Sequence, residues 1–421
     1  MYWTRRAWLG LFACWVIGSV YCPPVLCAEP AAIADEALLA EARQVHERAL
    51  TLDSHVDIAG PQYATPQLDP GADNPLLKCD LVKMVSGGVD GVFFAAYVPQ
   101  QACDADGYRR ASEAAMAKIS AIRRLTTMYP NRCALAATPD EVERIAAGGR
   151  RAIMIGIENG YAVGTELSSI QRFFDLGVRY ITLCHNGHNQ ICDSCNPSSG
   201  LGDDGSKDRG LSPLGRQFVA EMNRLGMMID LSHAAAGSFR DVVGLSRAPV
   251  IASHSGCAAL REHPRNLTDE QLKTLAAKGG VIQMVAVGGF LMPPSPERKK
   301  AIDELAASVG VTEGNFAAAA KPQRERFEQE MVELDRRYPP ACLKDFADHI
   351  DHAVQLAGVD HVGIGSDFDG GGGIHGFGSH AESLHVTVEL LRRGYSADAI
   401  AKIWGGNLLR VWREVQAVAA R

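Results

Sequence analysis

The 421-residue sequence has no excess of positive charge and no hydrophobic tail at its C-terminal end. It contains 42 Lys and Arg residues against 49 Asp and Glu residues, which gives a formal net charge of -7. A surface that attracts a phosphate backbone is therefore not indicated, and nucleic acid is not an expected partner. Because residues 411–421 lack a hydrophobic run, a C-terminal lipid anchor is not expected either.

The sequence also has no internal repeat of about 20 to 50 residues and no low-complexity tract. Hydrophobic residues make up 47% of the chain and charged residues 22%, values typical of a globular protein with a sizeable core. The length suits one large domain or two ordinary ones, although α/β barrels with insertions reach it as a single unit. The pattern of secondary structure must decide between these possibilities.

The long apolar run near the N-terminus has the features of a secretory signal. Arg5 and Arg6 precede an apolar stretch over residues 7–21, and small residues follow near Cys27 and Ala28. We predict a signal peptide over residues 1–28 and export to the periplasm or the extracellular space. The stretch is short for a membrane span. Residues 4–9 also resemble a twin-arginine signal, so both the general and the twin-arginine export routes remain open.

The number of cysteines is compatible with export. Three of the eleven cysteines lie in the predicted signal, and the eight that remain are Cys79, Cys103, Cys133, Cys184, Cys192, Cys195, Cys257 and Cys342. An even number permits disulfides in an oxidising compartment. The spacing of Cys192 and Cys195 also occurs in zinc knuckles and redox pairs, but the sequence has no second pair of this kind. We expect a local disulfide here, or two disulfides to other loops.

Eight short apolar runs alternate with longer amphipathic segments, a pattern typical of repeated βα units. The runs cover residues 51–57, 89–98, 152–158, 178–185, 227–233, 249–254, 280–286 and 361–367, and the helical segments include 108–128, 138–147, 213–225, 268–277 and 346–356. Eight strands with helical crossovers favour a closed barrel. We predict a (β/α)8 TIM barrel, formed by residues 29–421 as one catalytic domain. Residues 293–340 are charged and bounded by prolines, which indicates a helical insertion after the seventh strand.

Residues that can bind a metal follow several of these apolar runs. The carboxyl ends of the strands of such a barrel surround one mouth, so these side chains are expected to converge there. His55 and Asp57 are two residues apart on one strand and point to the same face. Glu158, His233 and His254 each end an apolar run, where a charge or an imidazole is costly unless it is paired or bound to a metal.

These residue types predict the metal and the number of ions. Imidazole and carboxylate ligands without thiolates suit zinc, although manganese, iron or cobalt also fit them. Five ligands are too many for one catalytic zinc with an open position, and Glu158 can bridge two ions. We therefore expect two Zn²⁺ ions per chain that lower the pKa of a shared water and polarise a substrate carbonyl, which would hydrolyse an amide without a nucleophilic serine or cysteine.

Three further residues are candidates for the chemistry, each with an alternative. Asp367 follows the last strand, where a carboxylate can pass a proton from water to the leaving amine, but its neighbours are also typical of a turn. His185 either stabilises a developing oxyanion or is a core histidine. Arg265 either binds a substrate carboxylate in bidentate fashion or is a surface cation.

Seven segments, in order, resemble the motifs of the membrane (renal) dipeptidase family. They are Asp-Ser-His-Val-Asp at 53–57, Glu158, Arg-Tyr-Ile-Thr-Leu-Cys-His-Asn at 179–186, Ile-Asp-Leu-Ser-His at 229–233, Ser-His-Ser at 253–255, Arg-Asn-Leu at 265–267 and Asp-Phe-Asp-Gly at 367–370. The similarity extends from about Leu50 to Trp412. It resembles most the bacterial-type zinc dipeptidases, which have amidohydrolase-like barrels.

The resemblance implies a role for each candidate. His55, Asp57 and Glu158 would hold one zinc ion, and Glu158, His233 and His254 would hold the other. His185 and Asp367 would serve the tetrahedral intermediate and proton transfer, and Arg265 would bind the terminal carboxylate of the substrate. The family hydrolyses free dipeptides, often with tolerance for a D-residue on the C-terminal side, and some members open β-lactam rings. Its members commonly form dimers, although no feature of this chain indicates a homodimer.

Two loops depart from the mammalian pattern, and two other functions compete with this one. Residues 186–193 form a longer segment than in mammalian members, and the insertion at 293–340 is also different. The resemblance therefore predicts the metal site better than the substrate preference.

One alternative is another dizinc amidohydrolase, such as a deacetylase, lactonase or deaminase. Many of these have His-x-His on the first strand and a modified lysine as bridge, unlike His55, Asp57 and Glu158 here. The other alternative is a non-catalytic exported binding protein, against which the presence of every expected ligand argues.

Overall fold

Parallel strands form a ring at the centre of the molecule. The computed structural model describes residues 36–293, 295–310 and 320–419, so the predicted signal lies outside the described residues. Ladders join neighbours in the order β1-β2-β4-β5-β6-β7-β8-β9, and β3 pairs with β4 outside this path. The strands are β1 (Leu52–Asp57), β2 (Gly91–Tyr97), β3 (Cys133–Leu135), β4 (Arg151–Glu158), β5 (Val178–Thr182), β6 (Met228–Asp230), β7 (Ile251–Ser255), β8 (Val281–Met284) and β9 (Val362–Ile364).

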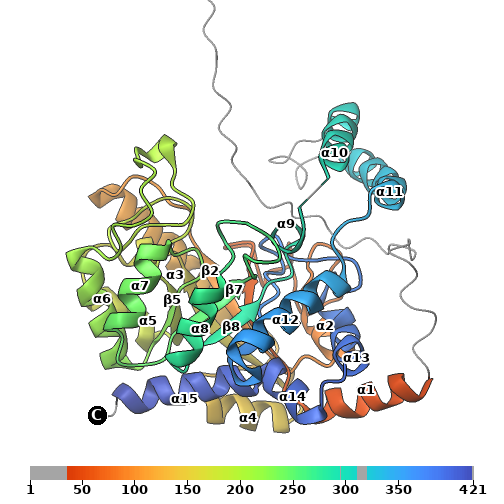
Figure 1. Cartoon of the computed structure of the whole chain (residues 1–421), viewed down its shortest axis with the longest axis horizontal. Coiled ribbons are helices and arrows are strands. Elements are labelled where there is room, and N and C mark those ends of the chain that lie inside the picture. Colours follow the sequence, from red (N-terminus) through yellow and green to blue (C-terminus); the bar gives the residue numbers. More distant parts are fainter. Residues whose placement is uncertain (1–35, 294, 311–319, 420–421) are drawn as a thin grey trace, which may run out of the picture.

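Helices surround this ring (Figure 1). They are α1 (Glu36–Arg48), α2 (Leu81–Ser86), α3 (Ala105–Met128), α4 (Pro139–Ala147), α5 (Ser168–Asp175), α6 (Pro213–Leu225), α7 (Ala236–Leu245), α8 (Asp269–Ala277), α9 (Gly288–Leu291), α10 (Pro296–Val309), α11 (Lys321–Arg337), α12 (Leu343–Ala357), α13 (Ser383–Arg392), α14 (Ala397–Ala401) and α15 (Asn407–Ala419). Local sequence fixes several of their ends. Thr268 and Gln271, for example, form a reciprocal capping box at the start of α8. The predicted (β/α)8 barrel is confirmed.

The first and last strands close the ring through a short seam. Val56 pairs in parallel with Phe368, and the Asp57 amide donates to the Phe368 carbonyl at 2.9 Å. The Asp367 amide likewise donates to the His55 carbonyl at 3.0 Å. The seam therefore joins the segment that carries His55 and Asp57 to the segment that carries Asp367.

Helix α15 covers the end of the barrel at which the strands begin. Trp412 packs in one buried cluster with Leu52, Ile251 and Val281, which are the first residues of β1, β7 and β8. In Figure 1 this helix runs along the base of the molecule. The candidate site residues lie at the other end, where the strands stop, as in (β/α)8 enzymes generally.

The insertion after the seventh barrel strand is helical, as predicted. Helices α10 and α11 stand above the barrel in Figure 1 and pack against each other around Leu305, Val309, Phe327 and Leu334. Residues 294 and 311–319 of the predicted insertion lie outside the described residues.

Several strands are shorter than predicted, and candidate site residues are among the residues that fall outside them. Strand β6 ends at Asp230 and β9 at Ile364, whereas the apolar runs continue to His233 and Asp367. Both of these residues have positive φ angles, 68° for His233 and 59° for Asp367, which a strand cannot accommodate. His233 and Asp367 therefore lie on the turns that follow the strands, whereas His55, Asp57, Glu158 and His254 lie within strands.

The expected disulfides are not present. No disulfide joins the eight cysteines of the described part. Most are buried, and several of their sulfurs contact backbone carbonyls, as Cys257 Sγ contacts the His349 carbonyl at 3.4 Å. Such a thiol packs as a small apolar side chain, which the number of cysteines cannot reveal.

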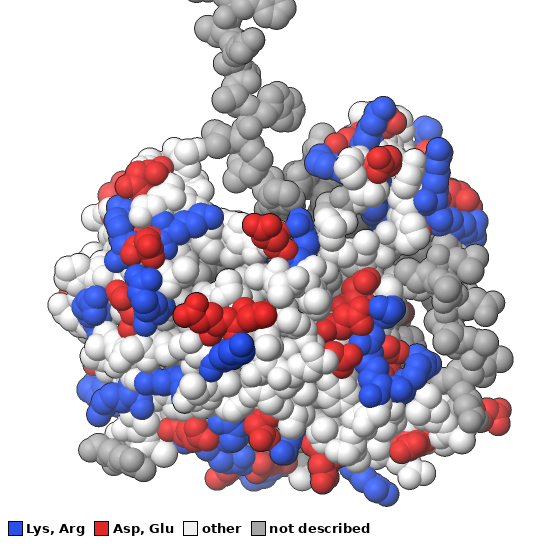
Figure 2. All heavy atoms as spheres, viewed as in Figure 1, with Lys and Arg blue, Asp and Glu red and all other residues white. Residues whose placement is uncertain are grey.

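Charges of both signs are interspersed on the surface. Figure 2 shows Lys and Arg side chains beside Asp and Glu side chains over the helices of the face that is drawn. Arg393, for example, forms ion pairs with Asp348 at 2.8 Å and Asp351 at 2.6 Å. This surface is typical of a protein that stays soluble through mixed charge.

Candidate metal centre

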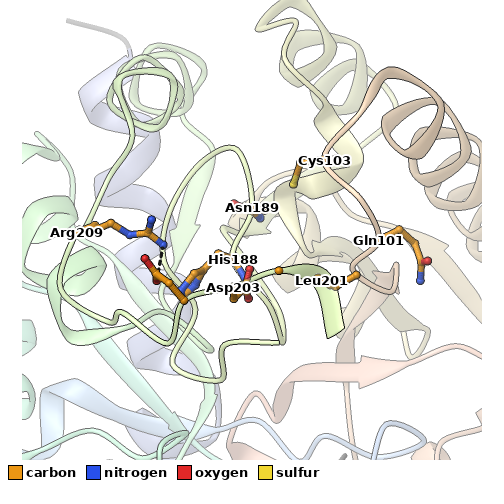
Figure 3. Close-up of a pocket in the computed structure, with 9 residues that line it drawn as sticks. Gln101, Cys103, His188, Asn189, Leu201, Asp203 and Arg209 are labelled. Atoms are coloured by element: carbon orange, nitrogen blue, oxygen red, sulfur yellow. Dashed lines mark hydrogen bonds and ion pairs between the residues drawn. The ribbon is translucent and has the colours of Figure 1, made fainter. Parts of the chain in front are cut away.

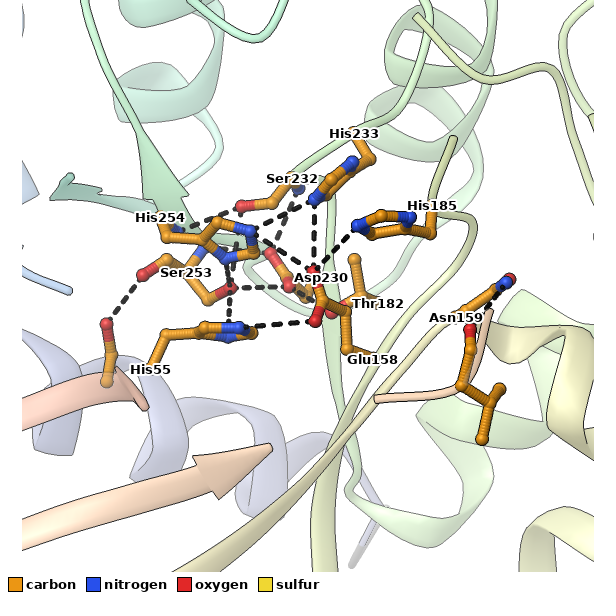
Figure 4. Close-up of polar contacts among 12 residues, drawn as sticks. His55, Glu158, Asn159, Thr182, His185, Asp230, Ser232, His233, Ser253 and His254 are labelled. Atoms are coloured by element: carbon orange, nitrogen blue, oxygen red, sulfur yellow. Dashed lines mark hydrogen bonds and ion pairs between the residues drawn. The ribbon is translucent and has the colours of Figure 1, made fainter. Parts of the chain in front are cut away.

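The five predicted ligands converge at the mouth of the barrel around one carboxylate. Glu158, the last residue of β4, has its Oε1 atom 3.0 Å from Nε2 of His233 and 3.4 Å from Nε2 of His254. Its Oε2 atom lies 3.5 Å from Nε2 of His55 (Figure 4). Asp57 completes a second group with His55 and Glu158. The two oxygens of Glu158 thus face two different sets of ligands.

The unpaired polar atoms of this cluster fit a pair of cations. Nε2 of His233 and Nε2 of His254 lie 3.1 Å apart, close to the separation of about 3.3 Å between two nitrogen ligands of a tetrahedral zinc. Among the described residues, Nε2 of His55 and Oδ1 of Asp57 are buried without a hydrogen-bond partner. Buried lone pairs that face one another are costly unless a cation lies between them. The residues therefore fit two adjacent ions that share Glu158.

The protonation of the three imidazoles differs. Burial, together with the charge of Arg265, lowers the pKa of His233 well below its usual value. Burial and the neighbouring His55 likewise lower the pKa of His254. For His55 burial acts in the same direction, but the Glu158 carboxylate outweighs it and raises the pKa of His55 to about 10. Neutral imidazole binds cations, so His233 and His254 are ready to bind and His55 must first lose a proton.

A row of hydroxyl groups behind the ligands orients their rings. Ser253 Oγ lies 2.8 Å from Nδ1 of His254 and donates a hydrogen bond to Oδ2 of Asp230 at 2.6 Å. The Tyr180 hydroxyl lies 2.8 Å from Nδ1 of His55. Such partners set the tautomer of a ligating histidine. Tyr180, Asp230 and Ser253 lie in the motifs that resemble the family, but their hydrogen bonds to the candidate ligands could not be predicted from those motifs.

His185 lies beside the ligands, with its Nε2 atom 3.7 Å from Oε1 of Glu158. Its ring packs against the rings of His233 and Tyr97, with centroids 4.1 Å and 4.6 Å away. Burial lowers the pKa of His185 to about 4. A neutral imidazole at the edge of the centre can donate one hydrogen bond to a substrate oxygen, and the alternative of an isolated core histidine does not describe this position.

Asp367 borders the centre from the seam side. It forms a third possible ligand group with His55 and His254, and burial raises the pKa of Asp367 to about 7. A carboxyl group that titrates near neutral pH can both accept and release a proton. Gly370 lets the following loop approach closely, because a Cβ atom there would lie 2.5 Å from Oδ1 of Asp367 and 2.0 Å from Oδ2 of Asp57.

Arg265 is buried, not a surface cation. Only 3% of the residue is exposed, and its Nη2 atom donates to the His254 carbonyl at 3.0 Å. Its Nε and Nη1 atoms are buried without a hydrogen-bond partner among the described residues. Nη2 bonds to His254 through one of its two hydrogens, so its other hydrogen and one of these two unpaired donors form the parallel pair that a carboxylate binds.

The segment that follows His185 forms a separate cavity beside the centre. The cavity has a volume of about 340 Å³ and is lined by Gln101, Cys103, His188, Asn189, Leu201, Gly202, Asp203, Asp204 and Arg209 (Figure 3). None of the predicted ligands lines it. The departure of residues 186–193 from the mammalian pattern therefore changes the surroundings of the centre and leaves its ligands in place.

Residues 39–421 match the membrane dipeptidase family, peptidase family M19. The chain belongs to the membrane dipeptidase family. Dipeptidase verJ of Clonostachys rogersoniana is 34% identical to this membrane dipeptidase over 349 residues, which are 81% of this chain and 77% of the relative. Dipeptidase tcpJ of Claviceps purpurea is 32% identical over 352 residues, which are 81% of this chain and 70% of the relative. The family and these relatives identify the chain as a peptide-bond hydrolase, as predicted.

Solved structures show the same architecture. The probable dipeptidase PvdM of Pseudomonas aeruginosa is 32% identical to this membrane dipeptidase, with a TM-score of 0.80 over 91% of this chain and 100% of that chain. A metallopeptidase of Rhodobacter sphaeroides, solved with a phosphinate mimic of L-Ala-D-Ala, has 24% identity and a TM-score of 0.68 over 87% of this chain and 99% of that chain. Within the described residues, no helix combines the length and apolar character that crossing a membrane requires.

Proposed function

We propose that this dipeptidase holds two zinc ions and hydrolyses the peptide bond of free dipeptides, including those with a D-residue on the C-terminal side. The observation that carries the proposal is the position of Glu158, whose two carboxylate oxygens face the two ligand groups. The ligands of each group are nitrogen and oxygen atoms, which suit zinc better than a softer metal. Tolerance for a D-residue follows from the family resemblance alone.

The chain's own residues bind and orient the substrate in this proposal. The guanidinium of Arg265 binds the terminal carboxylate through Nη2 and one of the two unpaired donors, Nε or Nη1. The neutral ring of His185 donates a hydrogen bond to the oxygen of the scissile carbonyl. When bound, divalent cations at such a centre supply a nucleophile at neutral pH and polarise the carbonyl. Asp367, whose pKa is near 7, holds the proton taken from water and delivers it to the leaving amine.

We also propose that residues 1–28 are an export signal and that residues 29–421 form the mature enzyme in the periplasm or outside the cell. The charge and apolar pattern of the N-terminal segment supports this proposal. N-terminal sequencing of the secreted protein would give the cleavage site. A protein that stays in the cytoplasm with residues 1–28 still attached would refute the proposal.

The experiment that tests the function combines metal analysis with a dipeptide panel. Purified protein should contain close to two zinc ions per chain, hydrolyse L,L and L,D dipeptides and lose activity with a chelator. Asp367→Asn should keep its metal and lose most of its turnover, which separates proton transfer from metal binding. Full activity after exhaustive metal removal, or hydrolysis of N-acetylated substrates in place of free dipeptides, would refute the proposal.

A further inference from the structure

Lys118 lies across the barrel mouth from Arg265. It belongs to α3, and its Nζ atom lies 5.4 Å from the centre of the Tyr97 ring at the end of β2. Arg265 follows β7 and bonds to the backbone of His254. In the order of the eight-stranded ring β2 is second and β7 is sixth, and these positions face each other across a closed barrel of eight strands.

The side chain of Lys118 lies close to the proposed metal centre. It interacts electrostatically with Asp57 and Glu158, and burial lowers the pKa of Lys118. None of the residues described in the structure forms a hydrogen bond or ion pair with it. When Asp57 and Glu158 hold cations, their charges no longer compensate the ammonium. A partly buried cation in that state gains from any anion that enters the mouth.

The surroundings of Lys118 place it next to the reacting part of the substrate. The ring of Tyr97 lies 5.4 Å from Nζ of Lys118 and packs against the His185 ring, with the ring centres 4.6 Å apart. In the proposed function Arg265 binds the C-terminal carboxylate and His185 contacts the scissile carbonyl. The first residue of the dipeptide then extends away from Arg265, toward β2.

We propose that Lys118 selects dipeptides whose first residue carries an acidic side chain, by binding that side-chain carboxylate. The inference rests on the proposed function, because the binding of the C-terminal carboxylate by Arg265 sets the direction of the substrate. A charge-assisted hydrogen bond between ammonium and carboxylate discriminates strongly against a neutral side chain of the same shape. A different role, in which Lys118 only balances Asp57 and Glu158, would affect all dipeptides equally.

The test compares L-Glu-L-Ala with L-Gln-L-Ala, which have nearly the same shape, on the full metal-loaded enzyme. We expect kcat/KM of the unaltered protein to favour L-Glu-L-Ala roughly tenfold, as a hydrogen bond to a charged group predicts, and the preference to shrink as salt is added. Lys118→Met should bring the ratio close to one, and Lys118→Arg should keep it above one. Lys273→Met, which removes an exposed lysine of α8, should keep the original ratio. Metal content is measured for every variant.

Two results would overturn the inference. One is an unaltered enzyme that cleaves L-Ala-L-Ala but shows no preference for L-Glu-L-Ala. The other is an equal loss on both substrates in Lys118→Met. If the metal-loaded enzyme cleaves none of these dipeptides, the proposed function itself fails. The preference of the unaltered protein and its salt dependence decide the question even if Lys118→Met does not fold.

Discussion

The Tyr180 hydroxyl oxygen lies 2.8 Å from Nδ1 of His55, and both side chains are fully buried. This contact engages one ring nitrogen and leaves Nε2 facing Glu158 at 3.5 Å. In the proposed centre, a cation on Nε2 would leave the proton on Nδ1, which would donate a hydrogen bond to the Tyr180 hydroxyl. We infer that the tyrosine determines which nitrogen of His55 faces the metal.

Removing this hydroxyl should weaken metal binding without changing the fold. We expect Tyr180→Phe to lower metal affinity by roughly ten- to a hundredfold, as the loss of a hydrogen bond behind a metal ligand does. Titration with zinc in a competing chelator measures the effect. The matched control is Tyr161→Phe, because Tyr161 is equally buried and its hydroxyl donates to the Ala102 carbonyl outside the centre. Equal zinc affinities in the two variants would show that Tyr180 has no role in metal binding.

Metal uptake should release protons and become tighter as pH rises. The Glu158 carboxylate raises the pKa of His55 to about 10 against the effect of burial, so His55 is protonated at neutral pH without metal. Burial also raises the pKa of Asp57. Protons therefore compete with the metal below about pH 10, and raising the pH toward that value removes the competition. Calorimetry at pH 7 in buffers of different ionisation enthalpy should detect at least one released proton per chain. A binding heat that does not depend on the buffer would contradict this assignment.

Gly370 should not tolerate a side chain. A Cβ atom there would lie 2.0 Å from Oδ2 of Asp57 and 2.5 Å from Oδ1 of Asp367, so Gly370→Ala must displace a metal ligand or the proposed proton carrier. A displacement of about 1 Å costs on the order of a hundredfold in rate. The variant should lose activity to this extent and part of its metal. Gly244→Ala is the control, because a Cβ atom at Gly244 meets nothing within 4 Å. Normal kinetics for Gly370→Ala would show that the loop is free to move away.

Arg265 should matter only for substrates with a free C-terminal carboxylate. We expect Arg265→Ala to lower kcat/KM for dipeptides roughly a hundredfold, as the loss of a bidentate, charge-assisted pair predicts. Dipeptide amides should lose much less. Arg261→Ala changes a half-buried arginine four residues earlier and should affect neither substrate. Equal losses on acids and amides would refute the carboxylate role.

The positions of the ligands could be predicted from the sequence because each one interrupts an apolar run. Glu158 ends β4 and His254 is the last but one residue of β7, and the convergence of strand ends in a barrel brings them together. Lys118 carried no such signal, because a lysine in an amphipathic helix is usually exposed. Tyr180 was also missed, because an aromatic residue in a buried strand is most often a packing residue.

Distances between side chains could not be predicted in the same way. The even number of cysteines suggested disulfides, yet Cys79, Cys133 and Cys257 are buried in the core as free thiols. The ends of the strands were also placed too late, because an apolar run continues unchanged through the turn at His233. Only the backbone angle of that residue, with φ of 68°, marks where the strand stops.

The seam between β1 and β9 can form only after residues 366–368 have been synthesised. The Ser366 amide donates to Oδ1 of Asp53 at 2.9 Å across 313 residues of chain, and contacts of such sequence separation form late in folding. A ribosome-bound chain that still lacks residues 366–368 has His55 and Asp57 but neither Asp367 nor the neighbour that completes the ring. We therefore expect a nascent chain to cleave dipeptides only after residues 366–368 have left the ribosome.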